Sequence, residues 1–142
     1  MAYFLSGAPT ASPDGWYGAH NSVGQTTAAT LWTLAEGRVG GPEGYQTFIL
    51  LANPHPSATA QVTVTFLRDD GDDTVTKVFD VPPSSRVTVS VDLWQVPEIE
   101  RGGFGASIQS TLPIVVERSM YSTIDGQVWV AGTNAAGTAG SF

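Results

Sequence analysis

The sequence predicts an all-β fold, an antiparallel β-sandwich of about eight strands. Three observations predict it. Apolar and polar residues alternate with a period of two in several segments, which is typical of strands with one face in water. Glycine and proline are frequent, at 16 and 9 residues, and many fall between these segments, where turns are needed. No segment shows a helical period with caps at its ends, so we expect sheets joined by tight turns.

Eight segments are predicted as strands. They are residues 31–36, 47–52, 61–66, 74–81, 86–91, 104–110, 114–121 and 128–132. Segment 47–52 is apolar on both faces and should be a central, buried strand. Pro113 is expected to open the strand that follows it, because proline suits the first residue of a strand. Residues 93–100 are predicted to form a short helical turn or a loop.

Composition and charge exclude several classes of function. Thirteen acidic residues stand against six basic ones, giving a net charge of −7. Such a surface would repel nucleic acids and anionic bilayers, so we expect no nucleic-acid partner. The apolar runs are far too short for a membrane span, so no membrane insertion is expected. The absence of cysteine excludes disulfides and thiolate metal sites.

The two ends of the chain resemble each other. The shared pattern is Asp-Gly, Trp, Asn and Gly, at Asp14, Gly15, Trp16, Asn21 and Gly24 and again at Asp125, Gly126, Trp129, Asn134 and Gly137. A short Met/Tyr run precedes each copy, and the copies lie 113 residues apart, a domain-sized period. We interpret residues 1–29 as a leader and linker that echo the C-terminal part of a preceding module, and residues 30–142 as the β-sandwich domain.

The leader contains a strand-like segment, residues 16–20, that is too short to fold alone. It should therefore pair with the domain's own sheet or with another molecule. Strand addition at a sheet edge is a common binding mode, and an unpaired edge promotes aggregation. We predict that the terminal segments serve assembly, with a homo-oligomer or tandem sister domains as the partner. The predicted assembly residues are Trp16, Tyr17, Asn21, Trp129 and Asn134.

Several runs carry a resemblance to known proteins. They are Trp-Thr-Leu-Ala-Glu-Gly at 32–37, Pro-Ile-Val-Val-Glu-Arg at 113–118, and the segments 45–54, 61–66, 81–86 and 104–108. Their order resembles an uncharacterised β-domain that recurs, often in tandem, in secreted bacterial proteins, and it is similar to the sensory rhodopsin transducer family. The resemblance covers roughly residues 31–123. Neither group offers a site motif to carry over.

The resemblance implies a β-sandwich that forms homo-oligomers, at the cell surface or outside the cell, with an export signal outside this chain. The leader departs from the compact transducer pattern and fits the tandem secreted group better. From these considerations we predict a non-enzymatic structural or assembly module. The alternative is a module that binds carbohydrate or another small ligand.

Two charged residues, Glu36 and Arg118, fall within predicted strands, where charges are unusual unless they are paired. The interpretation that we favour is a structural ion pair that joins the first strand of the domain to the Pro-Ile-Val-Val strand. The other is that Glu36 acts as an acid or a ligand in a sugar-binding cleft. Glu117 should face the opposite side of its strand from Arg118.

The remaining candidates for chemistry are weak. Segment 69–73 places four aspartates around Gly71, which suits a hairpin turn, with a weak Ca²⁺ site as the alternative. Trp94 and Tyr45 are the candidate carbohydrate-binding aromatics. The two histidines are expected in separate loops without further metal ligands, and no nucleophile elbow is present. We therefore predict no catalytic residues, no metal and no cofactor.

Overall fold

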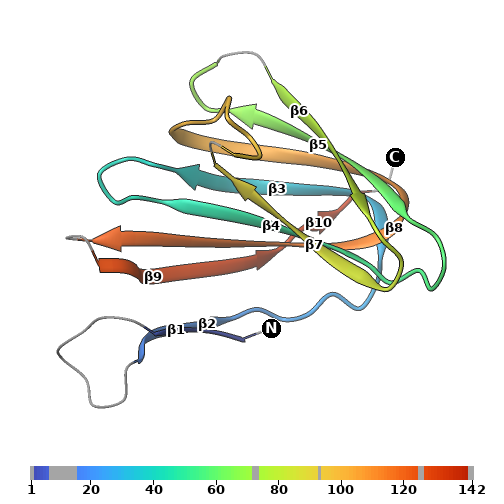
Figure 1. Ribbon diagram of the computed structural model, residues 1–142, viewed down its shortest axis with the longest axis horizontal. Helices are drawn as coiled ribbons and strands as arrows, with labels where there is room; N and C mark the ends of the chain where they lie inside the picture. Colours follow the sequence, from blue (N-terminus) through green and yellow to red (C-terminus); the bar gives the residue numbers. More distant parts are fainter. Residues whose placement is uncertain (1, 7–15, 72–73, 93, 125–126, 141–142) are drawn as a thin grey trace.

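The computed structural model describes residues 2–6, 16–71, 74–92, 94–124 and 127–140, with side chains from residue 22 onward except at 124–130. Strands are its regular elements (Figure 1). They are β1 (Ala2–Ser6), β2 (Trp16–Asn21), β3 (Ala29–Val39), β4 (Gln46–Asn53), β5 (Ala60–Arg68), β6 (Val75–Val81), β7 (Ser85–Val91), β8 (Gly102–Ile124), β9 (Gln127–Ala136) and β10 (Thr138–Ala139). Over the described ranges, no helix is long and apolar enough to cross a membrane.

The strands from β3 to β10 form two antiparallel layers that share β8. The first half of β8 pairs with β3 on one side and β5 on the other, with β10 beyond β3 and β6 beyond β5. The second half of β8 pairs with β4 and β9, with β7 beyond β4. The protein thus has the all-β, sandwich-like architecture that the sequence predicts (Figure 1).

The course of β8 corrects one prediction. Segments 104–110 and 114–121, expected as two strands, belong to one strand of 23 residues, and Pro113 lies inside it. Pairing with β5 ends at Ser110, and pairing with β4 begins at Val115. Proline lacks an N–H, and here it falls where β8 changes neighbours, so neither of those ladders needs a donor from it. The strand can therefore pass through Pro113 from one layer into the other.

The core lies between the two layers and is filled by every second side chain of their strands. In β5, residues 60, 62, 64 and 66 are buried, while the residues between them are exposed or half-buried. Segment 47–52 lies in β4 between β7 and β8, in the central position that its apolar pattern predicts. Trp32 is fully buried, and its Nε1–H donates to the carbonyl oxygens of Ala29 at 2.9 Å and Ile114 at 3.1 Å.

The leader forms a small sheet of its own. β2 pairs antiparallel with β1 and not with the domain's own sheets. The sequence does not indicate β1 as a partner, because its five residues are too few to show a period on their own. Pairing with another molecule stays a prediction. We call β1 and β2 the leader hairpin. His20, expected in a loop, lies in β2.

Both copies of the terminal echo lie in antiparallel hairpins. In the leader hairpin Ala2 is opposite Asn21, and in the hairpin of β8 and β9 Ser119 is opposite Asn134. The two Asp-Gly pairs of the echo lie outside the described residues. β2 lies beside β9, with Cα atoms of the two strands within 8 Å of each other (Figure 1). The leader hairpin therefore lies next to its own structural counterpart.

Candidate functional site

An apolar patch lies on the outer face of the layer formed by β4, β7, β9 and the second half of β8. Ile49 and Leu51 face the core, so Leu50 between them faces outward, as do Phe48, Ser119 and Tyr121 on the same alternation. We call Phe48, Leu50, Ser119 and Tyr121 the outer-face patch. Leu50 is only 5% exposed and Tyr121 only 6%. The rings of Phe48 and Tyr121 meet edge to face, 6.0 Å apart.

The end of the leader is attached to β9 beside this patch. Asn134 is opposite Ser119 in the β8–β9 ladder, so it lies on the same face. Its Nδ2 donates to Ser22 Oγ at 2.8 Å, and Gln25 Nε2 donates to the carbonyl oxygen of Gly137 at 3.2 Å. The structure therefore brings one predicted assembly residue, Asn134, to the leader.

The other predicted assembly residues are placed only by their backbone. Trp16, Tyr17 and Asn21 belong to β2, and Trp129 belongs to β9. Their side chains lie outside the described part of the chain. The two strands that carry these residues are neighbours.

The structure brings Glu36 and Arg118 together at the edge of the core. Arg118 follows Ile114 and Val116 on the inward side of β8, and its side chain is only 6% exposed. Arg118 Nη1 lies 3.8 Å from Glu36 Oε2, but the Glu36 side chain is 72% exposed. Burial lowers the pKa of Arg118, and the Glu36 charge only partly opposes this. The guanidinium nevertheless stays charged at any physiological pH.

The other contacts of Arg118 are with uncharged groups. Its Nη2 donates to Thr133 Oγ1 at 3.3 Å, and its Nη1 lies 3.7 Å from Met120 Sδ. A pocket of about 190 Å³ opens beside the guanidinium, where β3, β8, β9 and β10 meet. We call it the Arg118 pocket. It is lined by Thr33, Leu34, Ala35, Glu36, Arg118, Ala135, Ala136 and Thr138.

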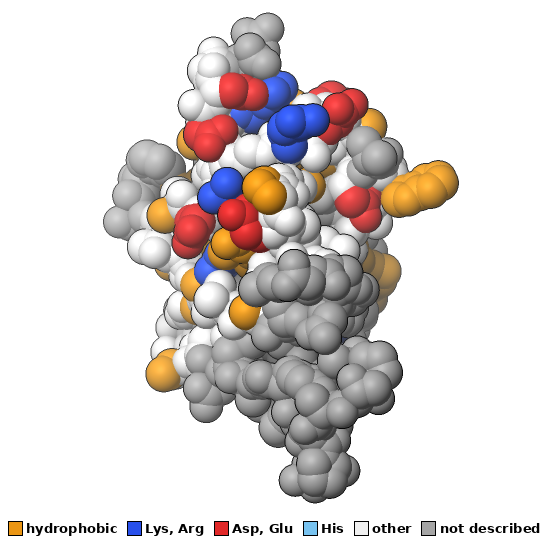
Figure 2. Space-filling view, turned by 90° about the vertical axis from the view of Figure 1, so that its left-hand side faces the viewer, with side chains coloured by type: hydrophobic (Ala, Val, Ile, Leu, Met, Phe, Trp, Pro, Cys, Tyr) orange, Lys and Arg blue, Asp and Glu red, His pale blue; other side chains and the backbone are white. Residues whose placement is uncertain are grey.

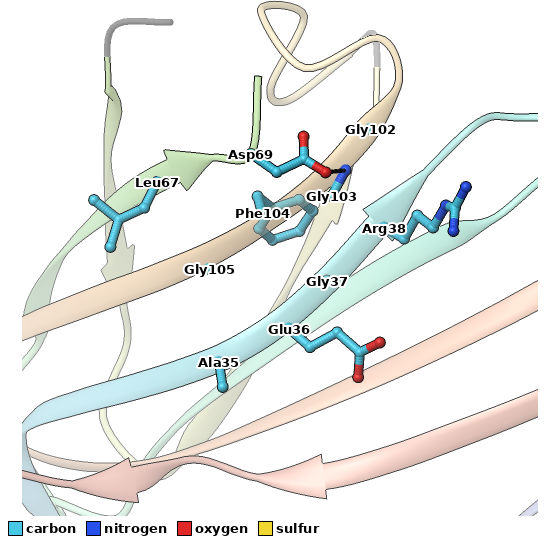
Figure 3. A pocket seen from close by; sticks show the side chains of 10 residues that line it. All are labelled: Ala35, Glu36, Gly37, Arg38, Leu67, Asp69, Gly102, Gly103, Phe104 and Gly105. Carbon is cyan, nitrogen blue, oxygen red and sulfur yellow. Dashed lines mark hydrogen bonds between the residues drawn. The ribbon is translucent and has the colours of Figure 1, made fainter. Parts of the chain in front are cut away.

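A larger and more open hollow, of about 410 Å³, lies over the ends of β3, β5 and β8 (Figure 3). Asp69 lies at its edge, where its carboxylate accepts the Gly103 N–H at 3.0 Å. Phe104 packs edge to face on Phe66, with ring centres 5.4 Å apart. A Cβ on Gly37 would lie 2.3 Å from the Phe104 ring, so only glycine fits there. Three charged side chains, Glu36, Arg38 and Asp69, line the hollow together with Ala35, Leu67, Phe104 and glycines.

The aspartate segment 69–73 behaves as a turn in the part that is described. Gly71 has a φ of +76°, which favours glycine. Asp69 is held by the Gly103 amide, and Asp70 forms an ion pair with Arg68. Asp72 and Asp73 lie outside the described residues. Among the described residues, no three histidines, aspartates or glutamates are grouped so that they could hold a metal.

Trp94 stands on a loop that is anchored in the core. The loop joins β7 to β8, and its Val96 and Ile99 are fully buried, whereas Trp94 is 91% exposed. Asp92 fixes the start of the loop by accepting the N–H groups of Trp94 and Gln95. Partial burial of Asp92 opposes ionisation, but bonds from Ser90 and these amides outweigh it and lower the pKa. The exposed indole thus projects from a loop that is anchored by buried Val96 and Ile99 and by Asp92.

Tyr45, the second candidate aromatic, has a different environment. It is half-buried in the turn between β3 and β4, where the Arg38 guanidinium lies 5.0 Å from the centre of its ring. This turn lies at the same end of the molecule as the Trp94 loop, since Gly40 approaches Glu100. Among the described contacts, the Tyr45 ring pairs with Arg38 and not with Trp94.

The exposed charges of this acidic protein are partly paired. Figure 2 shows acidic and basic side chains close together on the face that it presents. The ion pairs include Lys77 with Glu98, whose Nζ and Oε1 atoms are 2.7 Å apart. Exposed pairs of this kind contribute little to stability. They reduce the local negative field without removing the net charge of −7.

Sequence reasoning missed one residue with a large structural role, Asn53. It is buried at the end of β4, and its Nδ2 donates to the carbonyl oxygens of Ala58, Val81 and Pro82. Its Oδ1 accepts the N–H of His55, and His55 Nδ1 in turn accepts backbone N–H groups in the same loop. The pair Asn53-Pro54 reads as ordinary turn chemistry, so the sequence carries no signal for this role.

Comparison with known proteins places the fold. No family model matches the chain, and no curated protein matches it. Its structure is similar to the crystal structure of Thermotoga maritima 1070. The TM-score is 0.68 and the sequence identity 16%, and the match covers 80% of this chain and 96% of that one. It is also similar to the Anabaena sensory rhodopsin transducer, with a TM-score of 0.52 and 24% identity over 67% of this chain and 97% of that one.

These likenesses show a shared fold. The resemblance to the transducer family that the sequence predicts is therefore supported at the level of architecture. The tandem and secreted character implied by the other resemblance stays a prediction.

Proposed function

We propose that this protein is a non-enzymatic assembly module of a bacterial secreted or cell-surface protein, and that its terminal strand segments engage neighbouring copies. One observation carries the proposal: the leader hairpin stands outside the two-layer body, yet it lies beside β9 and is tied to it through Ser22 and Asn134. A segment that pairs with itself and docks on the body can dock equally on a neighbour, which is the basis of domain swapping.

The outer-face patch supports the same proposal. An isolated two-stranded hairpin is marginally stable in water, so the leader hairpin needs a surface to pack on. The patch offers the apolar side chains of Phe48, Leu50 and Tyr121 on the outer face of the layer that contains β9. In a tandem protein, the β8–β9 hairpin of the preceding module would take the place of the leader hairpin.

Deleting residues 1–27 is expected to abolish self-association and to lower the melting temperature by about 5–10 °C, because the hydrogen bonds of Ser22 and Gln25 and the packing of β2 beside β9 would be lost. Light scattering would measure the mass, and circular dichroism the melting. The matched control is Gln61→Ala in the full chain, which changes an exposed side chain of β5, a strand that pairs with β6 and β8, and should leave the mass unchanged. An unchanged mass and an unchanged melting temperature after the deletion would rule out assembly through the leader.

The alternative function, carbohydrate or small-ligand binding, is favoured by the exposed Trp94 alone. An exposed aromatic face on a loop anchored in the core is a suitable stacking surface for a sugar ring. If this function holds, tryptophan fluorescence should change with one member of a glycan panel. The change should vanish in Trp94→Ala and persist in Tyr45→Phe, which keeps a ring at the second position. A flat response across the panel would remove this alternative.

A further inference from the structure

We propose that the Arg118 pocket binds a small monocarboxylate, whose carboxylate group pairs with the Arg118 guanidinium. This inference does not depend on the assembly role, because the pocket lies between β3 and β9, on the inward side of β8. It depends on three observations: the burial of the guanidinium, the lack of a close carboxylate to balance its charge among the described residues, and the size and lining of the pocket beside it.

The burial of Arg118 demands a strong partner. A guanidinium carries a permanent charge, and withdrawing it from water is costly unless an anion binds it at short range. Only 6% of this side chain is exposed, and it follows two fully buried apolar residues, Ile114 and Val116, along β8. Such a charge is normally met by a carboxylate in two parallel hydrogen bonds.

Among the side chains that the structure describes, none supplies that partner at short range. Glu36 Oε2 lies 3.8 Å from Arg118 Nη1, beyond the range of about 2.7–3.2 Å for a hydrogen bond. The Glu36 side chain is mostly in water, so screening weakens its attraction further. Thr133 and Met120 offer only uncharged acceptors. The guanidinium therefore retains the capacity to bind an incoming anion, and the exposed Glu36 can turn away to admit it.

The size and walls of the pocket define the ligand. A volume of about 190 Å³ is below the roughly 300 Å³ of sites that hold drug-sized ligands, so the ligand has few heavy atoms. Three alanines, Ala35, Ala135 and Ala136, are among the lining residues and bring no polar side-chain group, which suits a short aliphatic tail. Glu36 and the net charge of −7 oppose a second negative charge. A short-chain monocarboxylate fits these conditions better than a phosphate.

Propanoate is the probe that tests the proposal, with propanamide as its neutral isostere. We expect saturable shifts of backbone amide resonances from β3, β8 and β9 when the full chain is titrated with propanoate at constant ionic strength. Propanamide and inorganic phosphate should give none. Shifts that rise linearly without saturation, or equal shifts with propanamide, would overturn the proposal.

Two substitutions separate a binding site from a structural ion pair. Arg118→Lys should weaken propanoate binding about tenfold, because an ammonium cannot form the two parallel bonds. Glu36→Gln should strengthen it, since the competing carboxylate is gone. The charge-matched control for Glu36→Gln is Glu100→Gln on the exposed surface, which should change nothing. If Glu36→Gln lowers the melting temperature and propanoate still does not bind, the residues form an ion pair only. This readout remains valid if Arg118→Lys fails to fold.

Discussion

Replacing Trp32 with alanine is expected to lower the free energy of unfolding by about 3–5 kcal/mol. The side chain is fully buried between the layers, so the substitution leaves a large cavity that the surrounding strands cannot close. It also leaves the carbonyl oxygens of Ala29 and Ile114 without the indole donor. A loss of this size is a large part of the total stability of an ordinary domain. Urea denaturation followed by circular dichroism would measure it.

Two further variants separate the contributions of side-chain volume, hydrogen bonding and burial to this loss of stability. Trp32→Phe keeps most of the volume but removes the Nε1–H, and we expect a smaller loss of about 1–3 kcal/mol from the unpaired carbonyl groups. Trp94→Ala removes the same side chain from an exposed position and should change stability by less than about 0.5 kcal/mol. A Trp32→Ala protein as stable as the Trp94→Ala protein would contradict the proposed packing of the core.

The second large effect is expected from Asn53→Ala, which should cost roughly 2–4 kcal/mol. Asn53 Nδ2 lies 2.9 Å from the Ala58 oxygen and 3.0 Å from the Val81 oxygen, so one side chain holds two segments together. Without it, buried backbone groups lose partners that water cannot easily replace. Thermal and urea denaturation would measure the loss.

Asn53→Asp provides the sharper comparison, because it preserves the size of the side chain and removes its donors. It should destabilise at neutral pH at least as much as alanine does. Asn134→Ala serves as the matched control. Its side-chain amide is only half-buried, so we expect this substitution to lower the free energy of unfolding by about 1 kcal/mol or less. If Asn53→Ala behaved like Asn134→Ala, the role of Asn53 in joining β4 to the end of β6 would be refuted.

The strands could be predicted where their side chains divide cleanly between water and core. Residues 61–66 and 86–91 show this division, and both lie within strands of the structure, β5 and β7. Prediction failed where the determining interaction is long-range. Pro113 marks a boundary in the sequence, yet β8 continues through it because the neighbouring strands change there. The two residues of β10 are too few to show any period.

The candidate sites, too, could be predicted from the sequence only in part. A charge in an apolar strand is visible in the sequence because its burial must be compensated, so Glu36 and Arg118 could be singled out as a pair. Their separation and the pocket beside them could not be predicted, because four strands distant in the chain build it. The outer-face patch was hidden for a related reason. Leu50 lies within an apolar run that reads as core on both sides.

The shared strand β8 has a mechanical consequence. In most two-layer β proteins the layers are held together chiefly by contacts between side chains, and they can in principle shear past each other. Here one uninterrupted length of backbone, 23 residues long, is hydrogen-bonded into both layers. Tension applied to one layer is therefore carried covalently to the other, and we expect the body to yield under load as a single cooperative unit.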